Sequence, residues 1–342
     1  MNTFIEEWAP QQGILMAFPD YSTDWNYIIE EAAQQYIRLI KTFTDNNVHV
    51  FLLYNDENII KDLLEIVNVK YLTLIKYKFN DTWTRDYGPI ALKNLDKISL
   101  VDFGFNGWGL KFAADKDNLA NLFLKEKGVI PSQKYINNRD FILEGGSIET
   151  DGKGLILTTT RCLCSPNRNG GLSKNEVERE LRKRLGAKKV LFLDYGYLMG
   201  DDTDSHVDTL ARIVPDNRIV FTGCSDQSDP HYEELLKMRK QLESFTNLED
   251  EKFSLYELPL PDPIFDSEGL RLPATYANFL LYDNLVFMPT YSQPEKDKEA
   301  AEILSNACRG YRVIGIDCST LIKQHGSLHC ATMQIPEGSF NI

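Results

Sequence analysis

Five polar residues of this chain have side chains that are suited to catalysis. Cys330 lies in the apolar stretch GSLHCATMQIP, and no cysteine near it in the sequence could be its disulfide partner. His206 and Asp208 lie two residues apart in SHVD, while Asp86 belongs to WTRDYGP and Glu144 to EGGS. A thiol can act as a nucleophile and an imidazole can transfer protons. Carboxylates can bind a cation or orient the imidazole.

Each of these groups, taken alone, also has a structural interpretation. A lone cysteine in an alternating strand is most often a core residue, because a free thiol buries like a small hydrophobic side chain. An Asp after Trp-Thr-Arg is typical of a turn or a cap, and EGGS is typical of a tight turn. His206 and Asp208 could bind a metal, but no third and fourth ligand follow at a matching spacing, so we expect no metal. Only a shared position in the fold would favour the catalytic interpretation.

The elements that must position these residues repeat along the chain. GGSIETDGKGLILTTT predicts a hairpin, SKNEVERELRKRLG a helix with a capping box between Ser173 and Glu176, and KKVLFLDY a buried strand. The same order of hairpin, helix and strand recurs in residues 205–260 and again in residues 275–317. The stretch that begins at Trp83 follows it more loosely. The sequence therefore predicts a repeated β-β-α-β unit.

The two ends of the chain complete the pattern. GSLHCATMQIP and the N-terminal GILMAFP are strands without a hairpin partner, and a helix over 25–43 and the strand VHVFLLY follow the second one. If the two ends pair, the chain closes into a ring of five units, which leaves fewer exposed sheet edges. A further helix and strand near residues 57–77 have no place in this scheme.

The ring predicts where the polar residues meet. Each unit has such a residue at or near the start of its first strand, and corresponding positions in a ring lie at one end of its axis. We therefore expect one cavity that Cys330 and His206 both face, while His329 points away from it along the strand. The residues that this scheme brings together are Asp86, Glu144, His206 with Asp208, Asn278 and Cys330.

Composition excludes several classes of function. The chain has 37 Lys and Arg against 50 Asp and Glu, a formal net charge of -13. This charge argues against a nucleic-acid partner and favours cationic ligands. No apolar run reaches the ~18 residues of a membrane span, and the start does not resemble a signal peptide. Six scattered cysteines are typical of reduced thiols in the cytoplasm. We expect residues 1–342 to form a single domain, and a homo-oligomer is compatible with the sequence.

The motifs WTRDYGP, FNGWG, EGGS, CLCSPNRN, SHVDTLARIV, LPATYANF and GSLHCATMQIP resemble those of the agmatine deiminase and bacterial-type peptidylarginine deiminase family. The resemblance runs from Trp8 to Pro336. It implies an α/β fold of the pentein class, a five-bladed propeller of ββαβ units with pseudo-fivefold symmetry. This chain departs from the glycine run that agmatine deiminases commonly carry before His-Cys, because it has His325 and Ser327 in QHGSLHC.

The resemblance also implies a role for each residue. Cys330 is the nucleophile that attacks the guanidinium carbon, and His206 protonates the departing ammonia and then activates water. Asp86 and Asp208 hold the guanidinium, while Glu144 orients the imidazole of His206. Trp83 is expected to flank the alkyl stem of the substrate, with Asn278 as a further substrate-binding residue from the fourth unit. No metal or organic cofactor is implied.

Three alternatives remain at this stage. Within the family, the small cationic guanidine agmatine competes with a peptide C-terminal arginine as substrate, and the absence of a recognisable secretion signal favours agmatine. A metal-dependent amidohydrolase could use His206, Asp208 and Glu144, and chelator-resistant activity would exclude it. A propeller that only binds ligands is disfavoured, because burying unpaired charges is destabilising.

Overall fold

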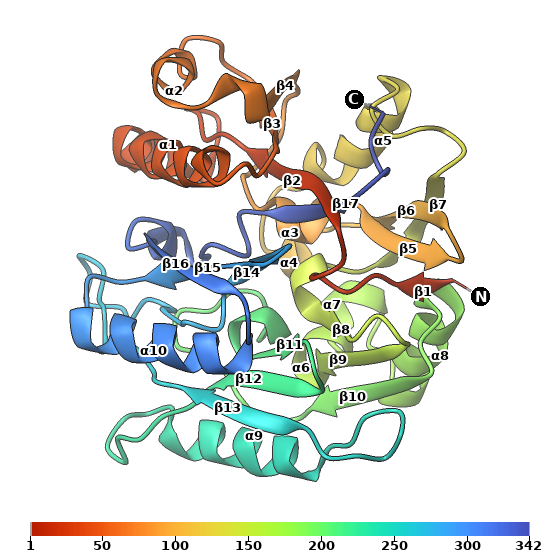
Figure 1. Cartoon of the computed structure of the whole chain (residues 1–342), viewed down its shortest axis with the longest axis vertical. Helices are drawn as coiled ribbons and strands as arrows, with labels where there is room; N and C mark the ends of the chain where they lie inside the picture. Colours follow the sequence, from red (N-terminus) through yellow and green to blue (C-terminus); the bar gives the residue numbers. More distant parts are fainter. Residues whose placement is uncertain (1, 342) are drawn as a thin grey trace.

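The computed structural model describes residues 2–341, and its strands form five small mixed sheets. The sheets follow one another in chain order around the molecule (Figure 1). Within each sheet an antiparallel strand pair is followed by a parallel neighbour. This is the pairing that a hairpin followed by a crossover helix produces, so the predicted repeat is confirmed.

The unit that follows Glu144 shows why these sequences fold as they do. Its elements are β8 (Ile148–Thr150), β9 (Leu155–Thr159), α8 (Lys174–Leu185) and β10 (Lys189–Leu193). The predicted capping box is present at the start of α8, and Gly186 ends the helix with a φ of 71°. A left-handed residue at this position favours glycine. One face of α8 is buried through Val177, Leu181 and Leu185, which fixes the helix against its sheet.

The next two units have the same construction. The third consists of β11 (Ala211–Val214), β12 (Arg218–Thr222), α9 (Tyr232–Ser244) and β13 (Ser254–Leu258). The fourth consists of β14 (Leu280–Tyr282), β15 (Leu285–Thr290), α10 (Pro294–Ala307) and β16 (Arg312–Asp317). Pro294 opens α10 as the sequence predicts, because proline lacks the N–H that the first helical turn cannot use.

The first unit acquires a strand that the sequence did not predict. Its own elements are β5 (Ile90–Asn94), β6 (Lys97–Gly104), α5 (Ala120–Glu126) and β7 (Tyr135–Ile142). The additional strand β1 (Thr3–Phe4) pairs antiparallel with β5. With only two residues, β1 is too short to show an alternating pattern in the sequence.

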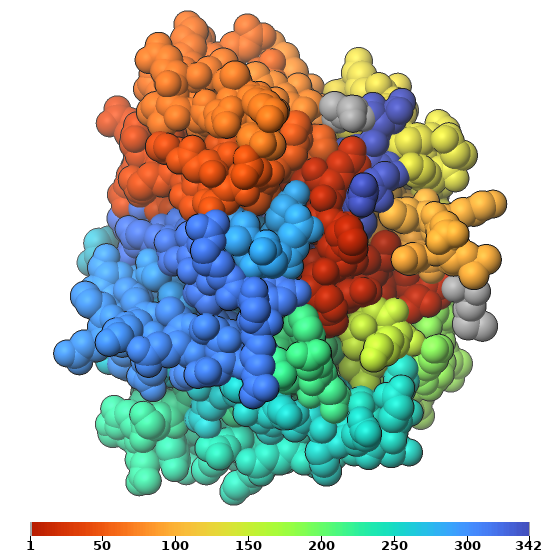
Figure 2. Space-filling view, in the orientation of Figure 1, coloured from red at the N-terminus to blue at the C-terminus, as the bar shows by residue number. Residues whose placement is uncertain are grey.

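The two ends of the chain pair, as predicted. β17 (Met333–Pro336) lies antiparallel to β2 (Gln11–Ala17), and α1 (Ile29–Asp45) and β3 (Val50–Tyr54) complete this unit. Figure 2 shows the N-terminal segment in red beside the C-terminal segment in blue. The unplaced helix and strand near residues 57–77 are α2 (Lys61–Ile66) and β4 (Leu72–Lys76), and β4 adds a parallel fourth strand beside β3.

Short helices lie in the connections within and between the sheets. Several of them stand immediately before the first strand of a unit, where the sequence placed the polar residues at or near the strand itself. The short helices are η1 (Asp24–Ile28), η2 (Val69–Tyr71), α3 (Thr84–Tyr87), α4 (Gly107–Leu110), η3 (Asp117–Leu119), η4 (Gly145–Ser147), α6 (Thr160–Leu163), α7 (Pro166–Asn169), η5 (Val207–Thr209) and η6 (Leu321–Gln324).

None of the helices within residues 2–341 has the length and apolar character that crossing a membrane requires.

Candidate active site

Five turns, one from each unit, deliver the predicted residues to one place. Asp86 lies in α3 before β5, Glu144 precedes η4 and β8, and His206 precedes η5 and β11. Asn278 comes just before β14, and Cys330 comes just before β17. The residues therefore occupy equivalent positions, but in turns rather than on strands.

Gly146 lies at the centre of this arrangement. A Cβ atom placed on it would lie 2.8 Å from Nδ1 of His206, 2.9 Å from Oδ1 of Asp86 and 3.0 Å from Oδ2 of Asp208. These distances leave no room for a side chain, so glycine is required by the close approach of the three groups. The predicted imidazole and carboxylates thus converge around one backbone position.

Cys330 is buried beside two acceptors. Its Sγ lies 3.8 Å from Oδ2 of Asp208 and 3.4 Å from Oδ1 of Asn278. The same oxygen of Asn278 accepts the backbone N–H groups of His329 and Cys330, so Asn278 fixes the turn that carries the thiol. Burial and the negative charges of Asp208 and Asp86 raise the pKa of Cys330 well above its ordinary value. In the unliganded protein this residue is therefore a neutral thiol.

His206 lies between two carboxylates without a close hydrogen bond. Its Nδ1 is 3.6 Å from Oδ1 of Asp86, and its Nε2 is 3.5 Å from Oε2 of Glu144. Neither ring nitrogen has a hydrogen-bond partner within residues 2–341. Burial opposes the charged form, but the charge of Asp86 and the contacts with Cys162 and Glu144 outweigh it and raise the pKa of His206 well above its ordinary value. The ring is therefore an imidazolium ion.

The two aspartates differ in their hydrogen bonds. Asp86 accepts the indole N–H of Trp108 at 2.8 Å and the N–H of Gly146 at 2.9 Å, and burial raises its pKa. Oδ2 of Asp208 accepts Nδ1–H of His329 at 2.8 Å, while its Oδ1 is buried without a partner in the described chain. Burial also disfavours ionisation of Asp208, but His329 and the neighbouring cations outweigh it and lower its pKa. Asp208 is therefore a carboxylate with one free oxygen.

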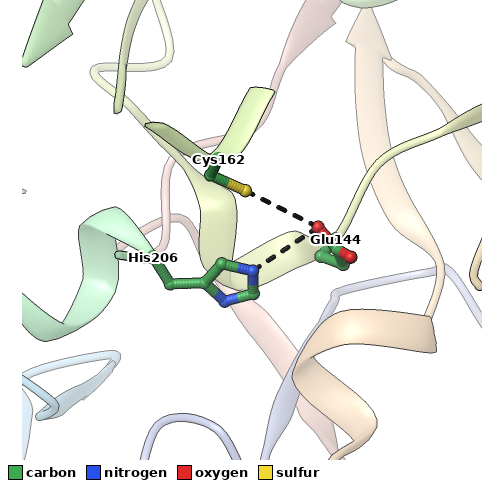
Figure 3. Close-up of side chains that lie close together, drawn as sticks. All are labelled: Glu144, Cys162 and His206. Atoms are coloured by element: carbon green, nitrogen blue, oxygen red, sulfur yellow. Dashed lines mark hydrogen bonds and ion pairs between the residues drawn. The ribbon is translucent and has the colours of Figure 1, made fainter. Parts of the chain in front are cut away.

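Glu144 is held by a buried arginine. Nε of Arg168 lies 2.7 Å from Oε2 and 3.1 Å from Oε1 of Glu144, and Nη1 of Arg168 lies 2.6 Å from Oδ2 of Asp204. Sγ of Cys162 donates to Oε2 of Glu144 at 3.7 Å, on the side that also faces His206 (Figure 3). Burial opposes ionisation of Glu144, but Arg168 and His206 outweigh it and lower the pKa. Glu144 is therefore ionised.

A cavity reaches this cluster from outside. Its aromatic wall is formed by Trp83, Trp108 and Phe112, and Cys330 lies on its surface. Its remaining lining residues are Asp24, Asp81, Asp86, Asp202, Thr203, Thr209, Gln324, His325 and Gly326. Four of these are carboxylates, and within residues 2–341 no Arg or Lys contributes to the lining. The cavity is therefore suited to a cation with an apolar stem.

The structure corrects two details of the predicted cavity. His206 was expected to face the cavity, but it is not among the residues that line it; its Nδ1 lies 3.6 Å from Oδ1 of Asp86, which is one of them. His329 points away from the cavity as expected, toward Glu7 and Arg212, but it also bonds Asp208, which the sequence did not predict. His329 has this orientation because residues 328–331 form a turn, so strand alternation does not apply to them.

Several residues of the site were not predicted from the sequence. Trp108 donates a hydrogen bond to Asp86, and Arg168 donates hydrogen bonds to Glu144. Both residues belong to motifs that carry the family resemblance, Trp108 to FNGWG and Arg168 to CLCSPNRN. Cys162, which stands in the same motif CLCSPNRN as Arg168, contacts Glu144. Arg212 pairs with the buried carboxylates of Glu7 and Glu149. Apart from its place in the motif SHVDTLARIV, nothing in the sequence indicated this role.

Among residues 2–341, two clusters of side chains have spacings that could hold a metal ion. One consists of Glu144, Cys162 and His206, and the other of Glu7, Glu149 and His329. The second cluster is already paired, because Arg212 bonds Glu7 at 2.8 Å and Glu149 at 2.6 Å and also reaches His329.

Comparison with known proteins agrees with this fold and site. The family model of Porphyromonas-type peptidyl-arginine deiminases matches residues 3–336. A Listeria monocytogenes protein, whose name ascribes agmatine deiminase activity to it, is 32% identical over 97% of this chain and 94% of its own. A crystal structure ascribed to a peptidyl-arginine deiminase is 44% identical, with a TM-score of 0.94 over 98% of this chain and 99% of that one.

A second solved structure carries a ligand. It is a serine-substituted agmatine deiminase of C. jejuni with substrate bound, 35% identical, with a TM-score of 0.90 over 99% of this chain and 97% of that one. Taken with the family match, these similarities show that the chain belongs to the Porphyromonas-type peptidylarginine deiminase and agmatine deiminase family.

Proposed function

We propose that this protein is an agmatine deiminase, which hydrolyses agmatine to N-carbamoylputrescine and ammonia. The observation that carries the proposal is the lining of the cavity, where four carboxylates and a thiol are accompanied by no Arg or Lys among the described residues. Agmatine has a guanidinium at one end and an ammonium at the other, so each end finds an anionic partner. The α-carboxylate of arginine would find none.

Two of the four carboxylates that line the cavity, Asp81 and Asp202, favour an ammonium ion in particular. Burial raises the pKa of Asp81 to about 7 and that of Asp202 to about 6. Such shifts indicate carboxylates without a sufficient counter-charge in the unliganded protein. The ammonium of agmatine would supply that charge, while Trp83 would pack against the butyl stem.

The runner-up is a peptidylarginine deiminase that converts a peptide C-terminal arginine to citrulline. The family description and the 44%-identical crystal structure favour it. A C-terminal arginine, however, brings a carboxylate close to the same acidic wall, and like charges repel. The charge of the cavity therefore favours agmatine.

The first half of the reaction follows from the charges at the site. The guanidinium binds Asp86 and the free Oδ1 of Asp208, which positions its carbon at Cys330. Its positive charge offsets the two carboxylates that raise the pKa of Cys330, so the thiol loses its proton to solvent. The thiolate attacks the carbon and forms a C–S bond. The C–N bond then breaks as His206 gives its proton to the departing ammonia, which leaves a thiouronium on Cys330.

The second half reverses the roles of the same groups. His206, now neutral, takes a proton from water, and the resulting hydroxide attacks the thiouronium carbon. The C–S bond breaks, the hydroxyl of the intermediate passes its proton to the departing thiolate of Cys330, and N-carbamoylputrescine is released with the neutral thiol restored. Glu144, held by Arg168, keeps the imidazole oriented throughout. These steps use only groups of this chain and water.

We further propose that the five sheets are the blades of a pentein propeller and that residues 1–342 act as one domain. The pairing of β17 with β2 supports this, because it joins the two ends of the chain in one sheet. Six free cysteines support the proposal that the protein works in the cytoplasm, and the oligomeric state is left open.

The proposal is tested by measuring ammonia release from agmatine, free arginine and a peptide that ends in arginine. We expect the largest kcat/KM for agmatine, with activity that persists in the presence of a chelator. The Cys330→Ser variant is the control, because it lacks the thiol that the proposed reaction uses as its nucleophile. Faster turnover of the peptide would favour the runner-up, and loss of activity on chelation would favour a metal-dependent amidohydrolase.

A further inference from the structure

We propose that Glu144, Cys162 and His206 form a binding site for a thiophilic divalent cation, of which Zn²⁺ is the representative, and that occupation of this site inhibits the enzyme. The three side chains come from separate turns and point toward one another (Figure 3). All three are buried. The inhibitory effect rests on the proposed function, whereas the binding of the metal does not.

The spacing of the three donor atoms is close to that around a tetrahedral zinc ion. Metal–ligand bonds of about 2.0–2.3 Å place neighbouring ligand atoms roughly 3.3–3.6 Å apart. Oε2 of Glu144 lies 3.5 Å from Nε2 of His206 and 3.7 Å from Sγ of Cys162. The third separation, between Nε2 of His206 and Sγ of Cys162, is within 4.8 Å, so a modest movement of the thiol would close it.

The donor atoms have free capacity to bind a metal. Both ring nitrogens of His206 are buried without a hydrogen-bond partner in the part of the chain described here. Arg168 bonds both oxygens of Glu144, but a carboxylate has about four acceptor positions, so Oε2 retains one for a metal. Arg168 would then orient the carboxylate from outside, as outer partners of metal ligands commonly do.

The charges of the donor groups suit a divalent cation. Zinc binds cysteine as the thiolate and histidine as the neutral imidazole, so metal binding releases protons. The carboxylate of Glu144 and the thiolate of Cys162 would together balance the two positive charges of the zinc ion.

The acidic cavity comes close to the site. The cavity leads to Asp86, which lies 3.6 Å from the ring of His206, and its other carboxylates include Asp24, Asp81 and Asp202. A cleft lined by one sign of charge concentrates ions of the opposite sign. Once zinc is bound to Nε2, the imidazole of His206 keeps a proton only on Nδ1. A metal-bound imidazole gives up that proton far less readily than an imidazolium ion does, so His206 can no longer protonate the departing ammonia. Occupation of the site therefore stops turnover.

The first experiment measures metal binding to the full chain without substrate. Isothermal titration with Zn²⁺ should give one tight equivalent in the wild type. The Cys162→Ser variant should bind at least tenfold more weakly, since it loses a ligand outright and even outer-partner losses weaken metal sites about 10–100-fold. Cys164→Ser is the matched control from the same segment and should bind as the wild type does. Magnesium should not compete, because it prefers oxygen ligands.

The Cys330→Ser variant decides which thiol is the ligand. It should retain the tight equivalent, and Co²⁺ added in place of zinc should show a thiolate charge-transfer band that disappears in Cys162→Ser and in Cys162→Ala. Circular dichroism checks that each variant is folded. Loss of binding in Cys330→Ser, or unchanged binding in both Cys162 variants, would overturn the proposal.

The second experiment measures inhibition. Zinc should inhibit ammonia release from agmatine in the wild type, and the concentration for half-inhibition should rise at least tenfold in Cys162→Ser relative to that variant's own metal-free activity. If no substrate is turned over but zinc still binds through Cys162, the proposed function fails and the metal site stands. If agmatine is turned over and zinc inhibits both proteins equally, the metal site fails.

Discussion

Replacing Asp208 with asparagine separates the two roles that the structure gives to this carboxylate. Oδ2 of Asp208 accepts a hydrogen bond from His329, and an amide oxygen can accept the same bond. Oδ1 is buried without a partner in the described chain and is free to bind the guanidinium. In the Asn variant an NH₂ group would take that place, so a donor would face the donors of the substrate. The substitution keeps the shape and removes the charge.

We expect the Asn variant to lose activity while its cysteine becomes more reactive. Breaking a desolvated charge pair costs about 3 kcal/mol or more, which corresponds to a fall of about 150-fold or more in kcat/KM. The same carboxylate raises the pKa of Cys330, second only to burial, so its removal should lower that pKa. Without substrate, iodoacetamide should then modify Cys330 faster at neutral pH.

The assay combines ammonia release from agmatine with mass spectrometry of the peptide that contains Cys330. Asp96→Asn is the matched control, since Asp96 is an exposed carboxylate in the turn between β5 and β6. The Asp96→Asn substitution should change neither kcat/KM for agmatine nor the rate at which Cys330 is alkylated. A wild-type kcat/KM in the Asp208→Asn variant would refute the guanidinium contact, and an unchanged rate of alkylation would refute its effect on the thiol.

Three further results are expected. Arg212→Met should lower the free energy of unfolding by about 3–5 kcal/mol in urea denaturation, because it leaves the buried carboxylate of Glu149 without its ion-pair partner and removes one of the cations beside Glu7; an unchanged midpoint would contradict this. Gly146→Ala should lose most activity while its circular dichroism stays native, because the new Cβ would lie 2.8 Å from Nδ1 of His206; near-normal turnover would show that the cluster is not needed. For agmatine, kcat/KM should fall as the pH drops through 7 and 6, since Asp81 and Asp202, with pKa values of about 7 and 6, become neutral below them. Butylguanidine, which lacks the ammonium, should show a smaller fall, and equal profiles would contradict the ammonium site.

The fold was largely predictable because its signals are local. The capping box at Ser173 marks a helix start through nearby backbone chemistry and is found where the sequence placed it, and Gly186 and Pro294 mark the end of α8 and the start of α10 in the same local way. The pairing of β17 with β2 was predicted only because both strands lacked another partner. The two-residue strand β1 has no such signal, since its pairing with β5 depends on tertiary contact.

The candidate site was predictable only in part, for a physical reason. The repeat placed Cys330 and the four acidic and imidazole groups at equivalent positions, and the structure brings them together. The partners that set their charge, such as Arg168 for Glu144, come from other turns and follow no period in the sequence. The orientation of His329 depends on a turn that pattern analysis treated as a strand.

The measurement that tests the central claim most directly is mass spectrometry of the protein quenched with acid during turnover of agmatine. We expect an adduct with the mass of agmatine less one ammonia, mapped to Cys330 and to none of the other five cysteines. It should be absent from the Cys330→Ser variant. Turnover of agmatine by that variant at a near-normal rate, or an adduct on another residue, would contradict the account.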